Sequence, residues 1–282
     1  MKPSQRPYFE IANPEIPNIL AGLGRGLRVL DVGCGSGVHV AELQRLHGHR
    51  VVGVDISASS IQKAKTRLAE AYVADVTQPD LYPFHGHQFF DVVLFSDMLE
   101  HLTDPLDVLM RHYQLLAAGG QILISLPNVA IWNVRLALLL GQFEYGDTGT
   151  LDRTHMRFFT RRSFRRFLRE AGLTVSRNRV TPGILRPFVP LIKRVYGGGS
   201  QTAVQGDSSS IMDSAPYRSY MRWLYPLERR ICALWPGFLA FQFVILAHPT
   251  SLARFHDAIS ADHICEDLAA LQNGDREGAG VV

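Results

Sequence analysis

Cysteine is scarce in this sequence, and its three copies are far apart. Cys34, Cys232 and Cys265 are the only cysteines among 282 residues, and no two of them have the C-x-x-C spacing. A disulfide scaffold needs several closely spaced pairs, and a structural zinc site needs clustered thiolates. The cysteine pattern therefore argues against both.

Long apolar runs are also missing. A largely apolar, uncharged stretch covers residues 231–247, but it is short and interrupted by Pro236, Gly237 and Gln242, so it is a poor candidate for a membrane span. The opening residues, MKPSQRP, contain no apolar segment of the kind found in signal peptides. These absences predict a cytoplasmic protein, with peripheral contact at the inner face of a membrane as the alternative.

Neither positive nor negative charge is in large excess. Charged residues make up 20% of the sequence and the formal net charge is +3, which gives little support for a nucleic-acid partner. Hydrophobic residues make up 46%, which argues against a disordered chain. This length and composition suit one globular domain with an insertion.

From residue 28 onwards, short β-rich segments alternate with segments of helical periodicity. The expected strands lie at 28–32, 51–55, 72–75, 90–95 and 121–126, and the helices between them at 38–46, 60–71 and 106–116. Ser57 precedes the second of these helices, where its side-chain oxygen would cap free backbone amides. Apolar strands that alternate with helices predict a parallel sheet covered by helices on both faces.

The pattern changes after residue 127. A helix is expected at 130–140 and another capped at its start by Thr160, and the last two strands are expected at 173–180 and 239–247. The helix after Thr160 has four apolar residues on one face: Phe164, Phe167, Leu168 and Ala171. We therefore expect an N-terminal helical segment at 1–27, a core domain at 28–182 and 239–248, a helical and flexible insertion at 183–238, and a C-terminal tail at 249–282.

The clearest chemical signal is the segment VLDVGCGSG at residues 29–37, where a strand runs into a glycine-rich turn and then a helix. Gly33, Gly35 and Gly37 would let the backbone approach a ligand closely. Their G-x-G-x-G spacing differs from the G-x-G-x-x-G of dinucleotide-binding folds. Asp31, just before the turn, would repel a pyrophosphate and attract a ligand with an amino group.

Carboxylates follow the next two strands in a similar way. Asp55 ends the second strand and could accept hydrogen bonds from both hydroxyls of a ribose. Asp75, followed by Val76, could accept one from an adenine amino group. Each aspartate alone is a weak signal because aspartate is common in turns. The segment FDVVLFSDMLEHL at residues 90–102 ends the fourth strand where open α/β sheets bind ligands, and it contains His101.

Taken in this order and spacing, the four segments resemble the class I S-adenosylmethionine-dependent methyltransferases over about residues 28–182. The resemblance implies an α/β, Rossmann-like, doubly wound sheet of seven strands with the last strand antiparallel, here with a helical insertion before that strand. It also implies S-adenosyl-L-methionine as the cofactor. The residues assigned to its binding are Asp31, Gly33, Gly35 and Gly37 for the methionine part, Asp55 for the ribose with Ile56 beside it, Asp75 and Val76 for the adenine, and Ser96 near the sulfonium.

Two segments after the fifth strand narrow the resemblance. LPNV at 126–129 and LDRTHMRFFT at 151–160 are similar to segments of ubiquinone-methyltransferase-like enzymes, a subgroup often found in surface-glycan or secondary-metabolite pathways. The long apolar and basic insertion departs from that subgroup, so the resemblance does not assign the acceptor.

The same region supplies the candidates for chemistry. Histidine is the side chain best suited to proton transfer near neutral pH, so His101 and His155 are the candidate general bases. Asp152 and Arg153, with Tyr145 from the same loop, are the candidates for binding the acceptor. No ligand set for a metal is evident. We expect methyl transfer to a hydroxyl of a small-molecule, glycan or lipid-linked acceptor, with an amine acceptor or an inert cofactor-binding adaptor as alternatives.

Other enzyme classes fit less well. A DNA amino-methyltransferase usually carries a D/N-P-P-Y/F motif where this sequence has SDML at 96–99. The glycine spacing and Asp31 disfavour an NAD-dependent oxidoreductase. Between residues 185 and 234, apolar and aromatic residues are combined with arginines. This composition suits a lid over the acceptor, a contact in a homodimer, or an interfacial helix on an anionic membrane.

Overall fold

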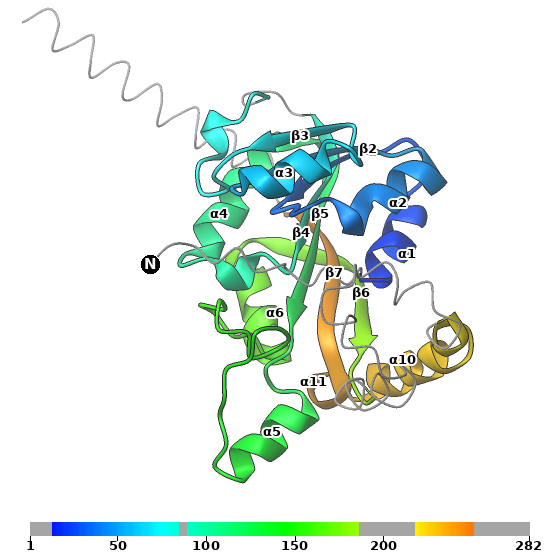
Figure 1. Ribbon diagram of the computed structural model, residues 1–282, viewed down its shortest axis with the longest axis vertical. Helices are drawn as coiled ribbons and strands as arrows, with labels where there is room; N and C mark the ends of the chain where they lie inside the picture. Colours follow the sequence, from blue (N-terminus) through cyan, green and yellow to red (C-terminus); the bar gives the residue numbers. More distant parts are fainter. Residues whose placement is uncertain (1–12, 85–88, 186–217, 251–282) are drawn as a thin grey trace, which may run out of the picture.

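The structure is a computed structural model that describes residues 13–84, 89–185 and 218–250 (Figure 1). A single sheet has the strand order β3-β2-β1-β4-β5-β7-β6. The strands are β1 (Arg28–Val32), β2 (Arg50–Asp55), β3 (Glu70–Val73), β4 (Phe90–Ser96), β5 (Leu116–Pro127), β6 (Leu173–Pro182) and β7 (Ala240–Pro249). The helices are α1 (Glu15–Ala21), α2 (Val38–His47), α3 (Ala58–Ala64), α4 (Pro105–Arg111), α5 (Trp132–Leu139), α6 (Arg161–Glu170), α10 (Tyr225–Leu234) and α11 (Pro236–Leu239).

The strand directions confirm the predicted fold class. β3, β2, β1, β4 and β5 pair in parallel, while β7 is antiparallel to both of its neighbours, β5 and β6. The seven-stranded sheet is therefore mixed, and its last strand runs against the others. A helical segment, α10 and α11, precedes that strand as expected.

Helices cover both faces of the sheet, because alternate residues of each central strand point to opposite sides. On one face, Val29 of β1 and Val51 of β2 belong to a core cluster with the apolar residues of α1, α2 and α3. On the other face, Leu30 and Val52 pack in a second cluster with residues of α4 and α6. This is the doubly wound arrangement, and it leaves the strand ends as the accessible edges.

Two helix starts follow the local sequence as predicted. The Ser57 side chain accepts a hydrogen bond from the backbone amide of Ser60 at the start of α3. Thr160 and Ser163 form a reciprocal capping box at the start of α6. Such caps satisfy backbone donors that the first helical turn leaves without partners.

The predicted helix at 60–71 is wrong in its second half. α3 ends at Ala64, and β3 begins at Glu70, two residues before the predicted strand. The reason is tertiary: the Arg67 guanidinium donates to both the carbonyl and the hydroxyl oxygen of Ser36, 2.9 and 3.0 Å away. Glu70 then pairs with Val52 across the sheet. These long-range contacts outweigh the helical periodicity of the segment.

The described part of the predicted insertion packs on the core. The Tyr225 hydroxyl of α10 donates to the buried Glu15 carboxylate of α1 at 2.9 Å, and Arg229 lies 3.5 Å from the same carboxylate. Residues 186–217 of the insertion, and the tail from residue 251 with Cys265, lie outside the described residues. Within the described residues, no helix is long and apolar enough to cross a membrane.

Candidate active site

Four strand ends carry the predicted cofactor residues to one edge of the sheet. β3, β2, β1 and β4 are successive neighbours and run in parallel, so the loops that follow them lie side by side (Figure 1). Asp31, Asp55 and Ser96 lie at the ends of their strands. This is the edge at which open α/β sheets bind ligands.

The glycine-rich loop after β1 adopts a backbone that other residues would resist. Gly33, Gly35 and Gly37 have φ angles of 77°, 53° and 75°. At Gly33, a Cβ atom would also lie 2.5 Å from the sulfur of Met98. The motif therefore depends on glycine both for its left-handed backbone and for the close approach of the chain.

Asp55 connects this loop to the end of β2. One carboxylate oxygen accepts a hydrogen bond from the Gly35 amide at 2.9 Å, and the other accepts one from the Ser57 amide at 2.8 Å. Each oxygen keeps a second lone pair for a further donor. Asp31, on the neighbouring strand, is only 2% exposed.

The remaining cofactor candidates lie at the same edge in different settings. Asp75 accepts hydrogen bonds from both the amide and the hydroxyl of Thr77, while Val76 is buried beside it. Ile56, the residue after Asp55, is 72% exposed. The Ser96 hydroxyl oxygen is buried and has no hydrogen-bond partner within the described residues.

At the turn that follows β4, the structure brings the two predicted histidines together. Their rings have centroids 4.8 Å apart and meet edge to face. His101 ends the short 3-10 turn after β4, and His155 comes from the loop between α5 and α6. The amides of Met156 and Arg157 donate to the Glu100 carbonyl oxygen, which ties that loop to the turn.

Hydrogen bonds to carbonyl oxygens define which nitrogen of each ring carries the proton. Nδ1 of His101 lies 3.2 Å from the Thr154 carbonyl oxygen, and Nδ1 of His155 lies 3.2 Å from that of Thr150. A carbonyl oxygen only accepts, so both Nδ1 atoms donate and both Nε2 atoms keep a lone pair. Burial lowers the pKa of both imidazoles, and the neighbouring His101 lowers that of His155 further. Both rings are thus suited to accept a proton.

Glu100 is the site residue that sequence reasoning missed. Its side chain is fully buried, and neither carboxyl oxygen has a hydrogen-bond partner within the described residues. Glu100, His101 and His155 each have one nitrogen or oxygen atom that could bind a metal ion, and these three atoms lie within 4.8 Å of one another. Burial raises the pKa of the Glu100 carboxyl well above its usual range, and the charge of the nearby Asp97 raises it further. Only the fold places this carboxyl beside His155, which is far away in the sequence.

The three predicted acceptor-binding residues have different environments. Asp152 is buried and organises its loop, because it accepts hydrogen bonds from the amide and the hydroxyl of Thr154 at 2.8 and 2.7 Å. Arg153 forms an exposed ion pair with Asp147 at 3.0 Å. Tyr145 is half exposed and has Phe158 as a ring neighbour. Asp152 therefore positions Thr154, and through it His101.

Comparison with known proteins identifies the family. The protein-family model described as a methyltransferase domain matches residues 5–178, more than half of the chain. The chain belongs to this methyltransferase family. Together with the glycine-rich loop and the carboxylates at the strand ends, this match makes it an S-adenosylmethionine-dependent methyltransferase, and S-adenosylmethionine is its cofactor.

Individual relatives agree with this family. The chain is 30% identical over 189 residues to a protein named ubiquinone biosynthesis O-methyltransferase from Aromatoleum aromaticum, covering 65% of this chain and 76% of that one. It is 37% identical over 108 residues to the protein of the same name from Citrobacter koseri, covering 36% of this chain and only 43% of that relative. Among solved structures, it is similar to a SAM-dependent methyltransferase from Archaeoglobus fulgidus, with a TM-score of 0.49, 18% identity, and 83% and 92% of the two chains covered.

Proposed function

We propose that this methyltransferase transfers the methyl group to a hydroxyl oxygen of a small-molecule acceptor. The observation that carries the proposal is the pair of neutral imidazoles, His101 and His155, brought together at the turn that follows Ser96, the residue proposed to lie near the sulfonium. A hydroxyl needs to lose its proton to attack, whereas a neutral amine does not. The relatives named ubiquinone biosynthesis O-methyltransferase support the same preference.

In this proposal, the edge of the sheet holds the cofactor. The buried Asp31 carboxylate receives the amino group of the methionine part, and the Asp55 carboxylate accepts the ribose hydroxyls with its remaining lone pairs. Asp75 and Val76 flank the adenine, and the exposed side chain of Ile56 packs against the cofactor.

The histidines then take the proton from the acceptor. The sulfonium is already activated, so alignment of oxygen, methyl and sulfur contributes most, on the order of 7–11 kcal/mol. A base in hydrogen-bond reach adds about 10²–10⁴-fold. Asp152 acts indirectly, as a positioning residue: it accepts hydrogen bonds from the amide and the hydroxyl of Thr154, whose hydroxyl and carbonyl oxygens lie within hydrogen-bond distance of His101 Nδ1.

A second candidate role for Glu100, His101 and His155 is the binding of a divalent cation. Two imidazoles and one carboxylate are a donor set of catalytic metal sites. A histidine that binds a metal through one ring nitrogen is usually oriented by a hydrogen bond from the other. Here both Nδ1 atoms are bonded to carbonyl oxygens, which leaves the Nε2 atoms for a metal. A cation would also satisfy the buried Glu100 oxygens. Bound there, it would lower the pKa of an acceptor hydroxyl.

The two roles of the cluster are separable by experiment. Glu100→Gln has the shape of a protonated glutamic acid but is a poor cation ligand. If the histidines act alone, this variant and chelator-treated enzyme keep their turnover. If a cation takes part, both lose turnover, and Mg²⁺, Mn²⁺ or Zn²⁺ restores the chelated wild type but not the variant.

An experiment with labelled cofactor identifies the acceptor. The protein is incubated with methyl-labelled S-adenosylmethionine and fractionated cell extract, and the labelled product is identified by mass spectrometry and NMR. An O-methyl product supports the proposal and defines the acceptor as a free small molecule, a glycan or a lipid-linked compound. An N-methyl product contradicts it. Cofactor binding without any product indicates an inert adaptor.

We further propose that the insertion covers the acceptor or joins two copies of the chain. In its described part, apolar side chains are exposed, including Trp223, Leu227 and Leu234. Light scattering of wild type and Trp223→Ser/Leu227→Ser tests the dimer. Flotation of the same proteins with anionic vesicles tests peripheral membrane contact, and recovery of only the wild type with vesicles would contradict the proposal.

A further inference from the structure

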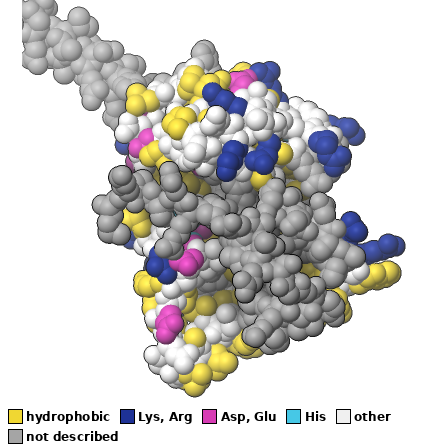
Figure 2. Space-filling view, viewed as in Figure 1, with side chains coloured by type: hydrophobic (Ala, Val, Ile, Leu, Met, Phe, Trp, Pro, Cys, Tyr) yellow, Lys and Arg dark blue, Asp and Glu magenta, His cyan; other side chains and the backbone are white. Residues whose placement is uncertain are grey.

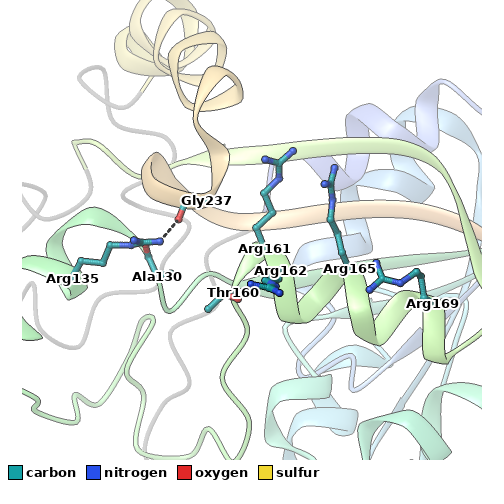
Figure 3. Close-up of a pocket in the computed structure, with 8 residues that line it drawn as sticks. All are labelled: Ala130, Arg135, Thr160, Arg161, Arg162, Arg165, Arg169 and Gly237. Carbon is teal, nitrogen blue, oxygen red and sulfur yellow. Dashed lines mark hydrogen bonds between the residues drawn. The ribbon is translucent and has the colours of Figure 1, made fainter.

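The outer face of α6 borders a cavity lined mainly by arginine (Figure 3). The cavity has a volume of about 550 Å³, and Arg135 of α5 faces four arginines of α6 across it. Those four are Arg161, Arg162, Arg165 and Arg169. Among the described residues that line the cavity there is no carboxylate.

The arginines follow the helical repeat of α6. Arg161, Arg165 and Arg169 are spaced four residues apart, so they lie on one face of the helix, while its apolar side chains pack into the core. Like charges at this spacing destabilise a helix. A row of three arginines therefore costs stability unless an anion offsets their charge.

The described part of the chain supplies no such anion. Within the part of the chain that the structure describes, none of the cavity arginines forms an ion pair with a carboxylate. The one acidic residue of α6, Glu170, lies 3.7 Å from Arg166, which does not line the cavity. Partial burial and the neighbouring Arg165 lower the pKa of Arg161, as expected where positive charges crowd together.

The cavity wall is partly organised before any ligand binds. Arg135 donates to the Ala130 carbonyl oxygen at 2.6 Å and to the Gly237 carbonyl oxygen at 3.4 Å, so its guanidinium is held between α5 and α11 (Figure 3). Thr160 already caps the start of α6 by accepting from the Ser163 amide. A ligand would therefore be bound by guanidinium groups and not by the free amides of the helix.

We propose that this arginine cavity binds the phosphate or diphosphate group of an organic ligand. A guanidinium is charged at every physiological pH, and its fork of donors matches two phosphate oxygens at once. The volume of about 550 Å³ lies in the range of small-molecule sites. The phosphate comes either from a soluble organic phosphate or from a lipid headgroup. The cavity shares no lining residue with the histidine cluster, and the proposal does not depend on the proposed acceptor.

Two adjacent arginines of α6 provide a matched test. Arg165→Gln removes a cavity arginine, and Arg166→Gln removes the same charge from the neighbouring position outside the cavity. Both side chains are exposed, so both variants should fold, which circular dichroism verifies. Calorimetry with inorganic pyrophosphate measures the soluble ligand. Flotation with phosphatidylglycerol–phosphatidylcholine vesicles, against phosphatidylcholine alone, measures the lipid headgroup.

We expect pyrophosphate to bind wild type and Arg166→Gln equally, and Arg165→Gln about tenfold or more weakly, as the loss of one charged contact implies. Arg161→Gln/Arg165→Gln should weaken binding further. If the natural source is a lipid, anionic vesicles recover wild type and Arg166→Gln but less of Arg165→Gln. Equal behaviour of the two single variants with both probes, or no binding of wild type to either, overturns the proposal.

Discussion

At the residue scale, Asp55 both shapes the glycine-rich loop and lies at the strand-end edge that we propose holds the cofactor. Its oxygens accept the Gly35 and Ser57 amides, and only the remaining lone pairs are available to a ribose. A sequence pattern could predict the ribose role but not the contact with Gly35, which depends on how β1 and β2 pair. Substitution of Asp55 is therefore expected to affect both the proposed cofactor contact and the loop.

We expect Asp55→Ala to weaken S-adenosylmethionine binding by about 1–3 kcal/mol, the value of lost charged hydrogen bonds. Asp55→Asn should have a smaller effect because one carbonyl oxygen remains as an acceptor. Calorimetric titration measures both, and Glu170→Ala, an exposed carboxylate on α6, is the matched control. Unchanged affinity in a folded Asp55→Ala protein removes this residue from the ribose role.

The two histidines give a second prediction at this scale. His101→Ala and His155→Ala should each lower turnover about 10²-fold while cofactor affinity stays near that of the wild type. His248→Ala, which removes an exposed histidine of β7, should leave turnover unchanged. Kinetics and cofactor titration of all three variants are the measurement. Full turnover of both site variants would mean that the acceptor is an amine or is already ionised.

Glu100 marks the limit of prediction from sequence at this scale. The segment that contains it was recognised, but a glutamate in a turn gives no local sign of being fully buried. Its position beside His155 depends on the backbone bonds from Met156 and Arg157 to residue 100, which join segments more than fifty residues apart. Local patterns do not contain such pairings.

At the scale of elements, the sequence predicts strands and helix starts better than helix ends. The caps at Ser57 and Thr160 act locally and were predicted correctly. The end of α3 was not, because Arg67 is held by Ser36 of a distant loop. The sequence also predicts the helix α5 but not that several of its leucines are exposed. Figure 2 shows exposed hydrophobic side chains at the end of the molecule where α5 lies.

The buried His112, which follows α4, gives an element-scale prediction. Its Nδ1 donates to the Val108 carbonyl oxygen at 2.7 Å, and its Nε2 lies 3.1 Å from the Tyr82 hydroxyl. Burial lowers its pKa to about 4. Between pH 6.5 and 4 the unfolded chain therefore binds a proton that the folded chain does not. As the pH falls from 6.5 to 4, the free energy of unfolding should therefore decrease by up to about 3 kcal/mol. Above pH 6.5, His112 should not make it depend on pH.

Denaturant unfolding at pH 7.5 and pH 5 measures this loss. His112→Gln keeps polar contacts at the position but does not titrate, so its stability should depend less on pH than that of the wild type. The same pH dependence in both proteins would assign the effect to other groups.

At the scale of the whole molecule, distant segments meet at the last strand. Gln242 of β7 is nearly buried, and its side-chain oxygen accepts hydrogen bonds from Asn13 at 3.2 Å and Thr181 at 3.1 Å. Its amide nitrogen donates to Asp97 at 2.7 Å. One side chain thus links the N-terminal segment, β6 and the start of the turn that carries Glu100 and His101.

This link supports a strained backbone. Asp97 has a φ of 49°, and within the described residues it is the only non-glycine residue with a positive φ. Ser125 of β5 also contacts it, through a hydroxyl that donates at 3.0 Å. A non-glycine residue in this conformation costs about 1–3 kcal/mol and persists only where its surroundings hold it. Gln242 is therefore expected to determine where the turn after β4 lies.

We expect Gln242→Met, which keeps the length of the side chain, to lower the free energy of unfolding by about 1–3 kcal/mol through the lost buried hydrogen bonds. It should also lower turnover, because Asp97 can then relax and displace Glu100 and His101, while cofactor affinity changes little. Gln121→Met is the control, since that glutamine makes one long bond of 3.4 Å to Ser176 at the surface. Denaturant unfolding and kinetics of both variants decide the matter: if Gln242→Met matches the control in stability and turnover, the turn is held by the strands alone.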